Sequence, residues 1–589
     1  MHRCLILLAF CLVVSWRPAH AADSLGLAID PFCGFPRVSM TGEPMESYSL
    51  QSLDDSLDGV TPWKPMMEFQ FEDGVKSWCD SEGRSVQRRF YRMIRLSAPI
   101  PEVRTRNFRL LDHTGRNHEL YYSFNDPSVV AYLIVFTGST CSNLIPVLPA
   151  LGRLSQTYGA DGLKIWGVSS AAGVARSRIA TEVANLKIKF PVLHDRSQFV
   201  SREFGIENVP EAVLIRNASF RVLYRGAVEE LDGAGGLLPY LEAAVDKAMA
   251  GEIPNPSRVR PLGRSADIAP LATPHYGREI APILQTKCVT CHSPGNIAPW
   301  AMTNHQSVSV FADSIKDEVL AARMPPWHSD SEVGRFANDT SLTTDEASKL
   351  VRWLSDGAPR HDGLDPLENV PADPPHWPMG PPDMILRIPN QSLPAFGDVD
   401  YRYIAVQPNL TADKWLKAAV VRPGNRRVVH HALVFLGSEA SALGGLTGFF
   451  AGYVPGMDPT WFPEGTGKLL PKGTQLTFQM HYISIGTPQT DQTELGLYFH
   501  STPPKQRLQT KSVWDVFFNI PARSAEHAIT RSSTPFAKTS WLYELSPHQH
   551  LRGKWFKYEL ELQDGTRRTL LNVPRYVFDW QRLYRFAEP

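Results

Sequence analysis

Two proline-rich stretches divide this chain of 589 residues into blocks whose hydrophobic patterns differ. Residues 251–274 (GEIPNPSRVRPLGRSADIAPLATP) and 371–383 (PADPPHWPMGPPD) mix proline with polar residues and lack a period, which is typical of linkers. A single domain usually has roughly 100 to 200 residues, so the length also requires more than one. We therefore predict a multidomain protein with linkers at 251–274 and 363–384.

The block before the first linker alternates apolar runs of strand length with helical stretches. The runs are VVAYLIVF at 129–136, LKIWGVSS at 163–170 and FPVLHD at 190–195. A continuous apolar run suits a strand that is buried on both faces of a sheet. Residues 99–250 are therefore predicted to form an α/β domain, whereas residues 22–98 carry no pattern that indicates a role.

The block between the linkers is predicted to be helical. Thr343 and Glu346 have the spacing of a capping box, in which each side chain caps the backbone of the other. The following apolar residues recur every three or four positions, at Ala347, Leu350, Val351 and Leu354. Gly357 and Pro359 then end the helix. We predict a compact all-α domain over 275–362.

Beyond the second linker the chain changes to short runs of alternating polarity. Examples are RRVVHHALVFLG, TQLTFQMHYISIG and KWFKYELELQDG, separated by Gly, Pro and Asp turns. Such runs indicate β-strands with one buried face. We predict an all-β region with one domain over 385–503 and a second over 504–589.

The N-terminus has the pattern of a secretory signal. Arg3 precedes an apolar stretch from Cys4 to Trp16, and Ala19-His20-Ala21 offers the small-x-small motif of a cleavage site. The alternative is an uncleaved anchor helix, but a bilayer requires about 20 apolar residues. We predict a signal peptide at 1–21, no transmembrane segment in the mature chain, and a location in the periplasm or cell envelope.

Charge offers no sign of a nucleic-acid partner. The chain has 60 basic and 60 acidic residues and no polybasic run. Redox partners or small substrates are the expected partners.

The string Cys288-Val289-Thr290-Cys291-His292 places two thiols and an imidazole on one helical turn. This pattern indicates covalent haem, attached through Cys288 and Cys291 and ligated by His292. A zinc half-site or a redox CxxC are the alternatives, but the sequence has no second CxxC to complete a zinc cluster. Met324 in RMPPWH follows His292 by 32 residues and is the expected sixth ligand.

His328 and His305 compete with Met324 for that role. The CVTCH and MPPW elements make residues 276–360 resemble the small cytochrome c modules of large bacterial exported proteins. The resemblance implies an all-α cytochrome c domain with one covalent haem c. If Cys33 also pairs with Cys79 in a disulfide, Cys141 remains as a lone thiol.

The all-β region contains three groups of histidines. His548 and His550 are two residues apart, so on a strand both face one side and can bind one ion. His430 and His431 are adjacent and reach one ion only if the backbone bulges or ends there. His481 in FQMHY is the third group. Imidazole ligands suit copper and zinc.

These motifs resemble those of the type II, ascorbate-dependent copper monooxygenases, the family of peptidylglycine and dopamine hydroxylases. The resemblance covers roughly residues 385–589 and implies a jelly-roll-type sandwich with two copper sites. It assigns His430, His431 and His481 to an electron-transfer copper. It assigns His548 and His550 to a catalytic copper. The family's downstream methionine ligand has no counterpart in residues 551–589, so either the second β domain is truncated or the site lacks its third ligand.

Cys141 should open the helix that follows the first apolar run. A helix N-terminus lowers the pKa of a thiol through its dipole. The position resembles the first cysteine of thioredoxin-like and peroxiredoxin-like proteins, and Val209-Pro210 fits the loop where that fold has a cis-proline. Leu144 stands at the second CxxC position, and Gly138 replaces the peroxiredoxin threonine. The resemblance implies a thioredoxin-like domain in which Cys141 is either a thiol nucleophile or part of a degenerate scaffold that docks or senses.

Together these features predict an exported oxidoreductase that binds haem and copper. Its expected activity is O2-dependent hydroxylation of a small organic molecule, with the fused haem module as electron donor and an external donor behind it. The alternatives are a non-catalytic electron-transfer or copper-binding protein, and a thiol peroxidase that acts through Cys141.

Overall fold

The computed structural model describes residues 26–589 apart from several short segments. Those segments are 33–34, 43–46, 55–62, 71–74, 80–88, 96–103, 229, 232–236, 255–257, 260–263, 362, 371–375, 378, 439–447, 458, 460 and 516. The predicted signal peptide lies outside the described residues, as does the predicted disulfide, since neither Cys33 nor the side chain of Cys79 is described.

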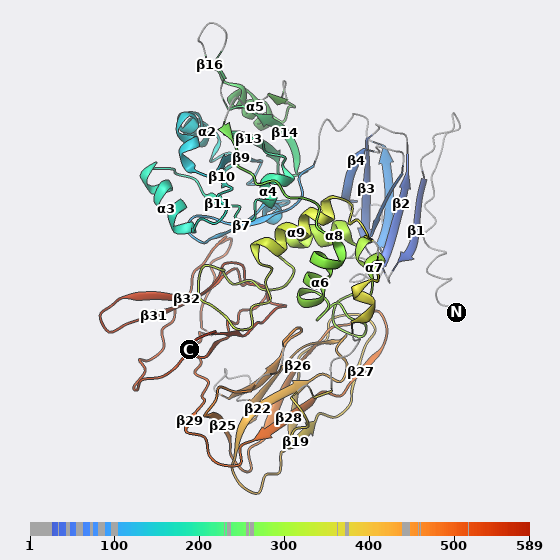
Figure 1. Ribbon diagram of the computed structural model, residues 1–589, viewed down its shortest axis with the longest axis vertical. Helices are drawn as coiled ribbons and strands as arrows, with labels where there is room; N and C mark the ends of the chain where they lie inside the picture. Colours follow the sequence, from blue (N-terminus) through green and yellow to red (C-terminus); the bar gives the residue numbers. More distant parts are fainter. Residues whose placement is uncertain are drawn as a thin grey trace.

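The N-terminal part of the chain forms two antiparallel sheets of three strands (Figure 1). In the order in which they pair, the strands of the first sheet are β1 (Gly26–Phe32), β2 (Phe35–Thr41) and β5 (Val75–Cys79). Those of the second are β4 (Lys64–Gln70), β3 (Ser47–Asp54) and β6 (Arg89–Arg95). A small apolar cluster with Val38, Met40 and Leu50 packs between them.

A mixed sheet is the centre of the following α/β part, with strand order β11-β10-β9-β13-β14-β17. The strands β9, β10 and β11 are parallel to one another, and β13 is antiparallel to both of its neighbours. Their bounds are β9 (Ala131–Gly138), β10 (Leu163–Ser169), β11 (Val192–His194), β13 (Glu211–Arg216), β14 (Arg221–Gly226) and β17 (Arg258–Val259).

Helices cover this sheet, and short strands and turns complete the α/β part. The helices are η3 (Cys141–Val147), α2 (Leu148–Tyr158), α3 (Arg176–Asn185), α4 (Phe199–Glu203) and α5 (Tyr240–Met249). The smaller elements are β7 (Arg109–Leu111), β8 (Asn117–Glu119), η2 (Leu120–Ser123), β12 (Asn208–Val209), β15 (Glu230–Leu231) and β16 (Leu237–Leu238). Every residue of β9 is buried, as its apolar sequence predicts. The predicted α/β domain is confirmed.

Two short parts of the first linker pair with the α/β part. Within residues 251–274, β17 adds to the edge of the mixed sheet, and β18 (Arg264–Ser265) pairs with β12. The stretch therefore lies along the domain that it leaves.

Residues 276–369 contain helices and no named strand among the residues described. The helices are η4 (Tyr276–Ile280), α6 (Ala281–Lys287), α7 (His305–Ser309), α8 (Ala312–Leu320), α9 (Thr344–Ser355) and η5 (Pro366–Asn369). The predicted capping box begins α9, since Thr343 Oγ1 accepts from the backbone N–H of Glu346 and Glu346 Oε2 accepts from that of Thr343.

One apolar core joins the α/β part to this helical segment. It extends from Phe108, Phe136 and Phe204 on the α/β side to Tyr276 and Trp353 on the helical side. Figure 1 shows α8 and α9 beside α4 and β7. Because they share a core, the two parts are held in a fixed relation to each other.

Residues 384–507 form a β-sandwich. One sheet has the order β19-β28-β22-β25-β29, the other β21-β26-β23-β24, and β20 pairs with β27 at one end. The first sheet contains β19 (Met384–Arg387), β28 (Glu494–Phe499), β22 (Lys414–Arg422), β25 (Thr466–Leu470) and β29 (Gln506–Arg507). The rest are β21 (Arg402–Val406), β26 (Leu476–Tyr482), β23 (Val429–Leu436), β24 (Phe449–Tyr453), β20 (Gln391–Leu393) and β27 (Gln489–Asp491).

The C-terminal 82 residues, 508–589, contain much less sheet. Two pairs of strands are present, β31 (Phe556–Glu561) with β32 (Arg567–Val573) and β30 (Glu544–Leu545) with β33 (Tyr584–Arg585). A cluster that includes Trp327, Leu571 and Tyr584 packs this end of the chain against the helical segment. Among the described residues, no helix has the length and apolar character to cross a bilayer.

Candidate functional site

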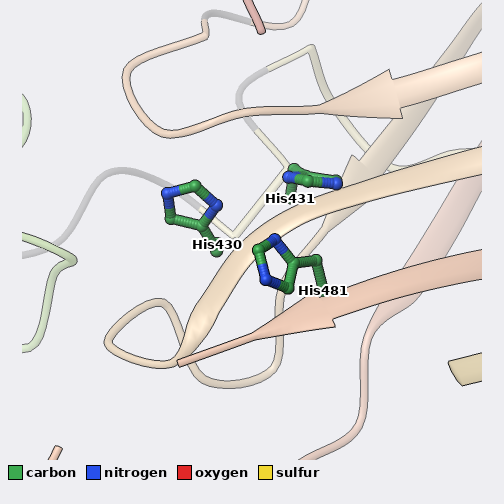
Figure 2. A group of neighbouring side chains, drawn as sticks. All are labelled: His430, His431 and His481. Atoms are coloured by element: carbon green, nitrogen blue, oxygen red, sulfur yellow. The ribbon is translucent and has the colours of Figure 1, made fainter. Parts of the chain in front are cut away.

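Three histidines converge on the sandwich (Figure 2). His431 on β23 is directly opposite His481 on β26, so both side chains project from the same face of the sheet. The register shifts between Val429 and His431, which leaves His430 as the extra residue of a bulge. Of the two alternatives, a bulge or a strand end, the structure has the bulge, and it turns His430 toward the other two rings instead of the opposite face.

The geometry of this three-histidine centre suits a metal ion. One ligand nitrogen from each ring lies within 4.8 Å of the other two. His430 and His431 are buried, and Nδ1 of all three rings has no hydrogen-bond partner among the described residues. Burial and the neighbouring imidazoles lower the pKa of His431 to about 2 and that of His481 to about 4. The rings are therefore neutral at physiological pH, the form in which imidazole binds a metal.

Tyr401 borders the centre and was not predicted from the sequence. Its ring stacks on His481, with centroids 4.7 Å apart and an interplanar angle of 19°. Burial raises the pKa of Tyr401 to about 12, so the hydroxyl stays protonated. The contact fixes the plane of His481.

His548 and His550 lie together, although not on a strand. The predicted strand is wrong, since both residues follow β30 in an irregular segment. Their ring centroids are nevertheless 5.3 Å apart. Nδ1 of His548 lies 2.9 Å from Oε1 of buried Gln581, a partner that sequence reasoning missed. Because the amide oxygen can only accept, Nδ1 carries the proton and Nε2 keeps its lone pair.

The histidine pair is close to the three-histidine centre. The ring of Phe578 lies between them, 5.9 Å from His550 and 6.3 Å from His481. The charge of His548 also contributes to the lowered pKa of His431. Among the described residues, however, only the three-histidine centre brings together three or more metal-binding side chains of the His, Cys, Asp and Glu types. The pair offers two imidazoles.

The CVTCH motif forms the helical turn that haem attachment requires. The backbone N–H of His292 donates to the carbonyl oxygen of Cys288 at 2.9 Å, so both thiols lie on one turn at the end of α6. His292 Nδ1 lies 3.1 Å from the carbonyl oxygen of Trp300, which leaves Nε2 as the nitrogen available to iron. Neither Cys288 nor Cys291 is in a disulfide. These residues therefore fit a covalent haem.

The three sixth-ligand candidates differ in their surroundings. Met324 is half-buried in the loop after α8. His305 is engaged elsewhere, because its Nε2 lies 2.8 Å from the carbonyl oxygen of Ala358. His328 is buried, and neither of its ring nitrogens has a hydrogen-bond partner among the described residues.

The CVTCH turn packs directly against the sandwich. A Cβ atom on Gly456 would lie 3.1 Å from Cys291 Sγ. Gly456 follows β24, whose Tyr453 pairs with Ala432, the neighbour of His431. The predicted haem and copper ligands thus belong to neighbouring parts of one contact surface.

Cys141 occupies the predicted position but not the predicted environment. It begins η3, is fully buried, and its backbone N–H donates to Glu182 Oε2 at 2.9 Å. Burial and the Glu182 carboxylate raise the pKa of Cys141 to about 12. The expectation of a lowered pKa is wrong, since desolvation and a carboxylate outweigh the helix dipole. The peptide bond between Val209 and Pro210 is cis, as predicted.

No protein-family profile and no curated protein matches this chain. Among solved structures it is similar to a hypothetical protein from Sinorhizobium meliloti 1021, with 24% identity over 28% of this chain and 95% of the other, and a TM-score of 0.26. It is also similar to the thioredoxin domain of a thiol-disulfide oxidoreductase from Bacteroides vulgatus (18% identity, 25% and 94% coverage, TM-score 0.20). A third is a peroxidoxin from Mycobacterium tuberculosis (16% identity, 25% and 92% coverage, TM-score 0.19).

Proposed function

We propose that this protein is an exported oxidoreductase that binds one covalent haem c and copper, and that hydroxylates a small organic molecule with O2. The three-histidine centre is the observation that carries the proposal. A centre made of three neutral imidazoles suits copper or zinc, and its position beside a haem-attachment turn favours the redox-active metal.

The proposed reaction consumes two electrons. The substrate C–H bond, O2, two electrons and two protons give a C–OH bond and one water. Copper, when bound, supplies one-electron redox chemistry and the activation of O2. Each turnover would therefore draw two electrons from an external donor, and the contact between Cys291 and Gly456 would hold a bound haem close to the sandwich.

The chain itself contributes ligands and their orientation. In this proposal His430, His431 and His481 hold an electron-transfer copper. His548 and His550 would hold a second copper, which would supply the activation of O2. The Gln581 amide fixes the tautomer of His548, so that the lone pair of Nε2 would be available to a metal.

A second candidate is an electron-transfer or copper-binding protein without hydroxylase activity. It is favoured by the histidine pair, which offers two ligands where a stable site usually has three or more. A thiol peroxidase acting through Cys141 is a weaker candidate, because the thiol is buried and its pKa is raised.

The metal and haem content of the purified full-length protein separates these candidates. The pyridine haemochrome spectrum should give one haem c per chain, and elemental analysis should give two coppers for the hydroxylase. His431→Ala should remove one copper and His548→Ala the other, while the partly exposed His376→Ala should retain both.

A single copper, lost in His431→Ala and kept in His548→Ala, would instead support the electron-transfer candidate. Zinc in place of copper would refute both candidates, and absence of haem would refute the haem half of the proposal. The haem result does not depend on copper loading, so the two halves of the proposal can fail separately.

A further inference from the structure

Three parts of the chain meet at the loop that contains Met324. Nη1 of Arg109, on β7 of the α/β part, donates to the carbonyl oxygen of Ala322 at 3.2 Å. Nε of Arg582, near the C-terminus, donates to the carbonyl oxygen of Pro326 at 3.1 Å. Two buried arginines from distant parts of the sequence therefore contact one loop of the helical segment.

His328 ends this loop in an unusual environment. Its side chain is 2% exposed, and neither Nδ1 nor Nε2 has a hydrogen-bond partner among the described residues. Burial and the charges of Arg109, Arg575 and Arg582 all lower its pKa. A buried polar group left without a partner typically costs about 1–3 kcal/mol, so the arrangement calls for a ligand that satisfies it.

Arg575 adds a second buried donor without an aligned acceptor. Its Nη1 lies 3.2 Å from Glu119 Oε2, yet the two atoms do not align as a hydrogen bond, and both are buried. Glu119 is already engaged, since its Oε1 accepts from Asn107 Nδ2 at 2.9 Å and lies 3.5 Å from Arg323 Nη1. Arg323 in turn pairs with Glu318. One carboxylate is thus shared between two arginines at this junction.

The balance of donors and acceptors indicates the chemistry of the missing partner. The His328 ring provides a donor nitrogen, and Arg575 Nη1 another, among three guanidinium groups that all act on the imidazole. A neutral ligand could satisfy these donors but would add no negative charge beside the three guanidinium groups. An oxyanion would both accept these hydrogen bonds and neutralise charge.

We propose that His328, Arg109, Arg575 and Arg582 form a buried oxyanion site at the junction of the α/β part, the helical segment and the C-terminal part. Carboxylate or phosphate oxygens would bind Arg575 Nη1 and one nitrogen of His328. Arg109 would then be the contribution of the α/β part to this site, and that contribution requires no thiol chemistry.

Two sources can supply such oxygens. One is a haem propionate, because Arg582 lies close to Cys291. A Cβ atom added to Gly456 would be 3.3 Å from Arg582 Nη2 and 3.1 Å from Cys291 Sγ. This source rests on the proposed function. The other is a free small anion, which requires no haem.

Isothermal titration of the full-length, haem-loaded protein with inorganic phosphate and with succinate tests the free anion. The test variant is Arg575→Gln, and the matched control is Arg567→Gln, an exposed arginine on the neighbouring β32. A free-anion site predicts saturable binding at one anion per chain, which Arg575→Gln reduces about tenfold or more and Arg567→Gln leaves unchanged.

Spectroelectrochemical titration of the haem between pH 5 and 9 tests the propionate. An arginine lowers the pKa of a nearby carboxyl by about 1–3 units, so Arg575→Gln should raise the pH at which the haem potential changes by about one unit or more. Arg567→Gln should not move it. In this case neither phosphate nor succinate binds to the unmodified protein.

His328→Gln provides a second variant in case Arg575→Gln does not fold. The glutamine retains a hydrogen-bonding side chain. Like Arg575→Gln, it should weaken anion binding or raise the pH at which the haem potential changes. Absence of anion binding, together with an unchanged pH profile in both variants, would overturn the site. Absence of haem from the protein would refute the proposed function while leaving the anion titration a valid test of this site.

Discussion

The thiol of Cys141 is kept protonated by the side chains around it. Because its pKa is about 12, roughly one molecule in ten thousand carries the thiolate at pH 8. The thiolate is the reactive form. We expect native full-length protein to resist iodoacetamide at Cys141 at pH 7, with the rate rising about tenfold per pH unit up to pH 10.

Mass spectrometry of the peptide that contains Cys141 would measure this reaction. Glu182→Gln removes the carboxylate that raises the pKa and should increase the rate at a given pH. Arg178→Gln, which alters an exposed partner of Glu182 and leaves that carboxylate in place, is the control. Complete alkylation of the native protein within minutes at pH 7 would show that the thiol is activated.

Single-residue chemistry was predictable from the sequence where a local motif defines it. The resemblance to the copper monooxygenases assigned His430, His431 and His481 to one site, and the structure brings their ligand atoms within 4.8 Å of one another. Tyr401 and Gln581 were missed because their roles depend on a stacking contact and a hydrogen bond made far along the chain. No period or motif in the sequence records such contacts.

The helix α9 shows how far local sequence defines one element. Its capping box satisfies two backbone N–H groups, and Trp353 and Leu350 on its inner face are fully buried. We expect Thr343→Ala to lower the free energy of unfolding by about 1 kcal/mol, because the N-cap hydrogen bond is lost. The measurement is urea denaturation of the full-length protein, followed by far-UV circular dichroism.

Thr344→Ala, one residue further on and also exposed, is the matched control and should change stability by less than about 0.5 kcal/mol. Equal losses in the two variants would mean that the cap contributes nothing. Helix caps can be predicted in this way because all of their atoms lie within a few residues. Strands cannot be predicted in this way, because a strand also needs a pairing partner from elsewhere in the chain. The segment around His548 and His550, which is irregular, is an example.

At the scale of the whole molecule, the arrangement of the parts depends on contacts between residues that are hundreds of positions apart. Asn572 donates to the carbonyl oxygen of Gly115, 457 residues away, and Arg176 pairs with buried Asp330. The sequence predicted the α/β part, the helical block and the sandwich, but it contained no information on which surfaces would meet. The contact between Cys291 and Gly456 is another contact between residues far apart in the sequence.

Gly456→Ala tests whether that meeting matters for electron transfer. Gly456 has φ +73°, and an added Cβ would lie 3.1 Å from Cys291 Sγ and 3.3 Å from Arg582. Gly473 also has φ +73° but has no atom within 4 Å of an added Cβ. Both substitutions should therefore cost about 1 kcal/mol of stability through backbone strain, while Gly456→Ala also requires Cys291 Sγ and the Arg582 guanidinium to shift by a few tenths of an ångström.

Stopped-flow oxidation of the reduced haem by the copper-loaded protein would separate these effects. We expect Gly473→Ala to match the unmodified protein and Gly456→Ala to be slower, because electron transfer needs the two parts in contact. Equal rates in the two variants, at equal haem and copper content, would show that electrons leave the haem by another surface. The paired glycines thus isolate contact between the parts from the strain that both substitutions share.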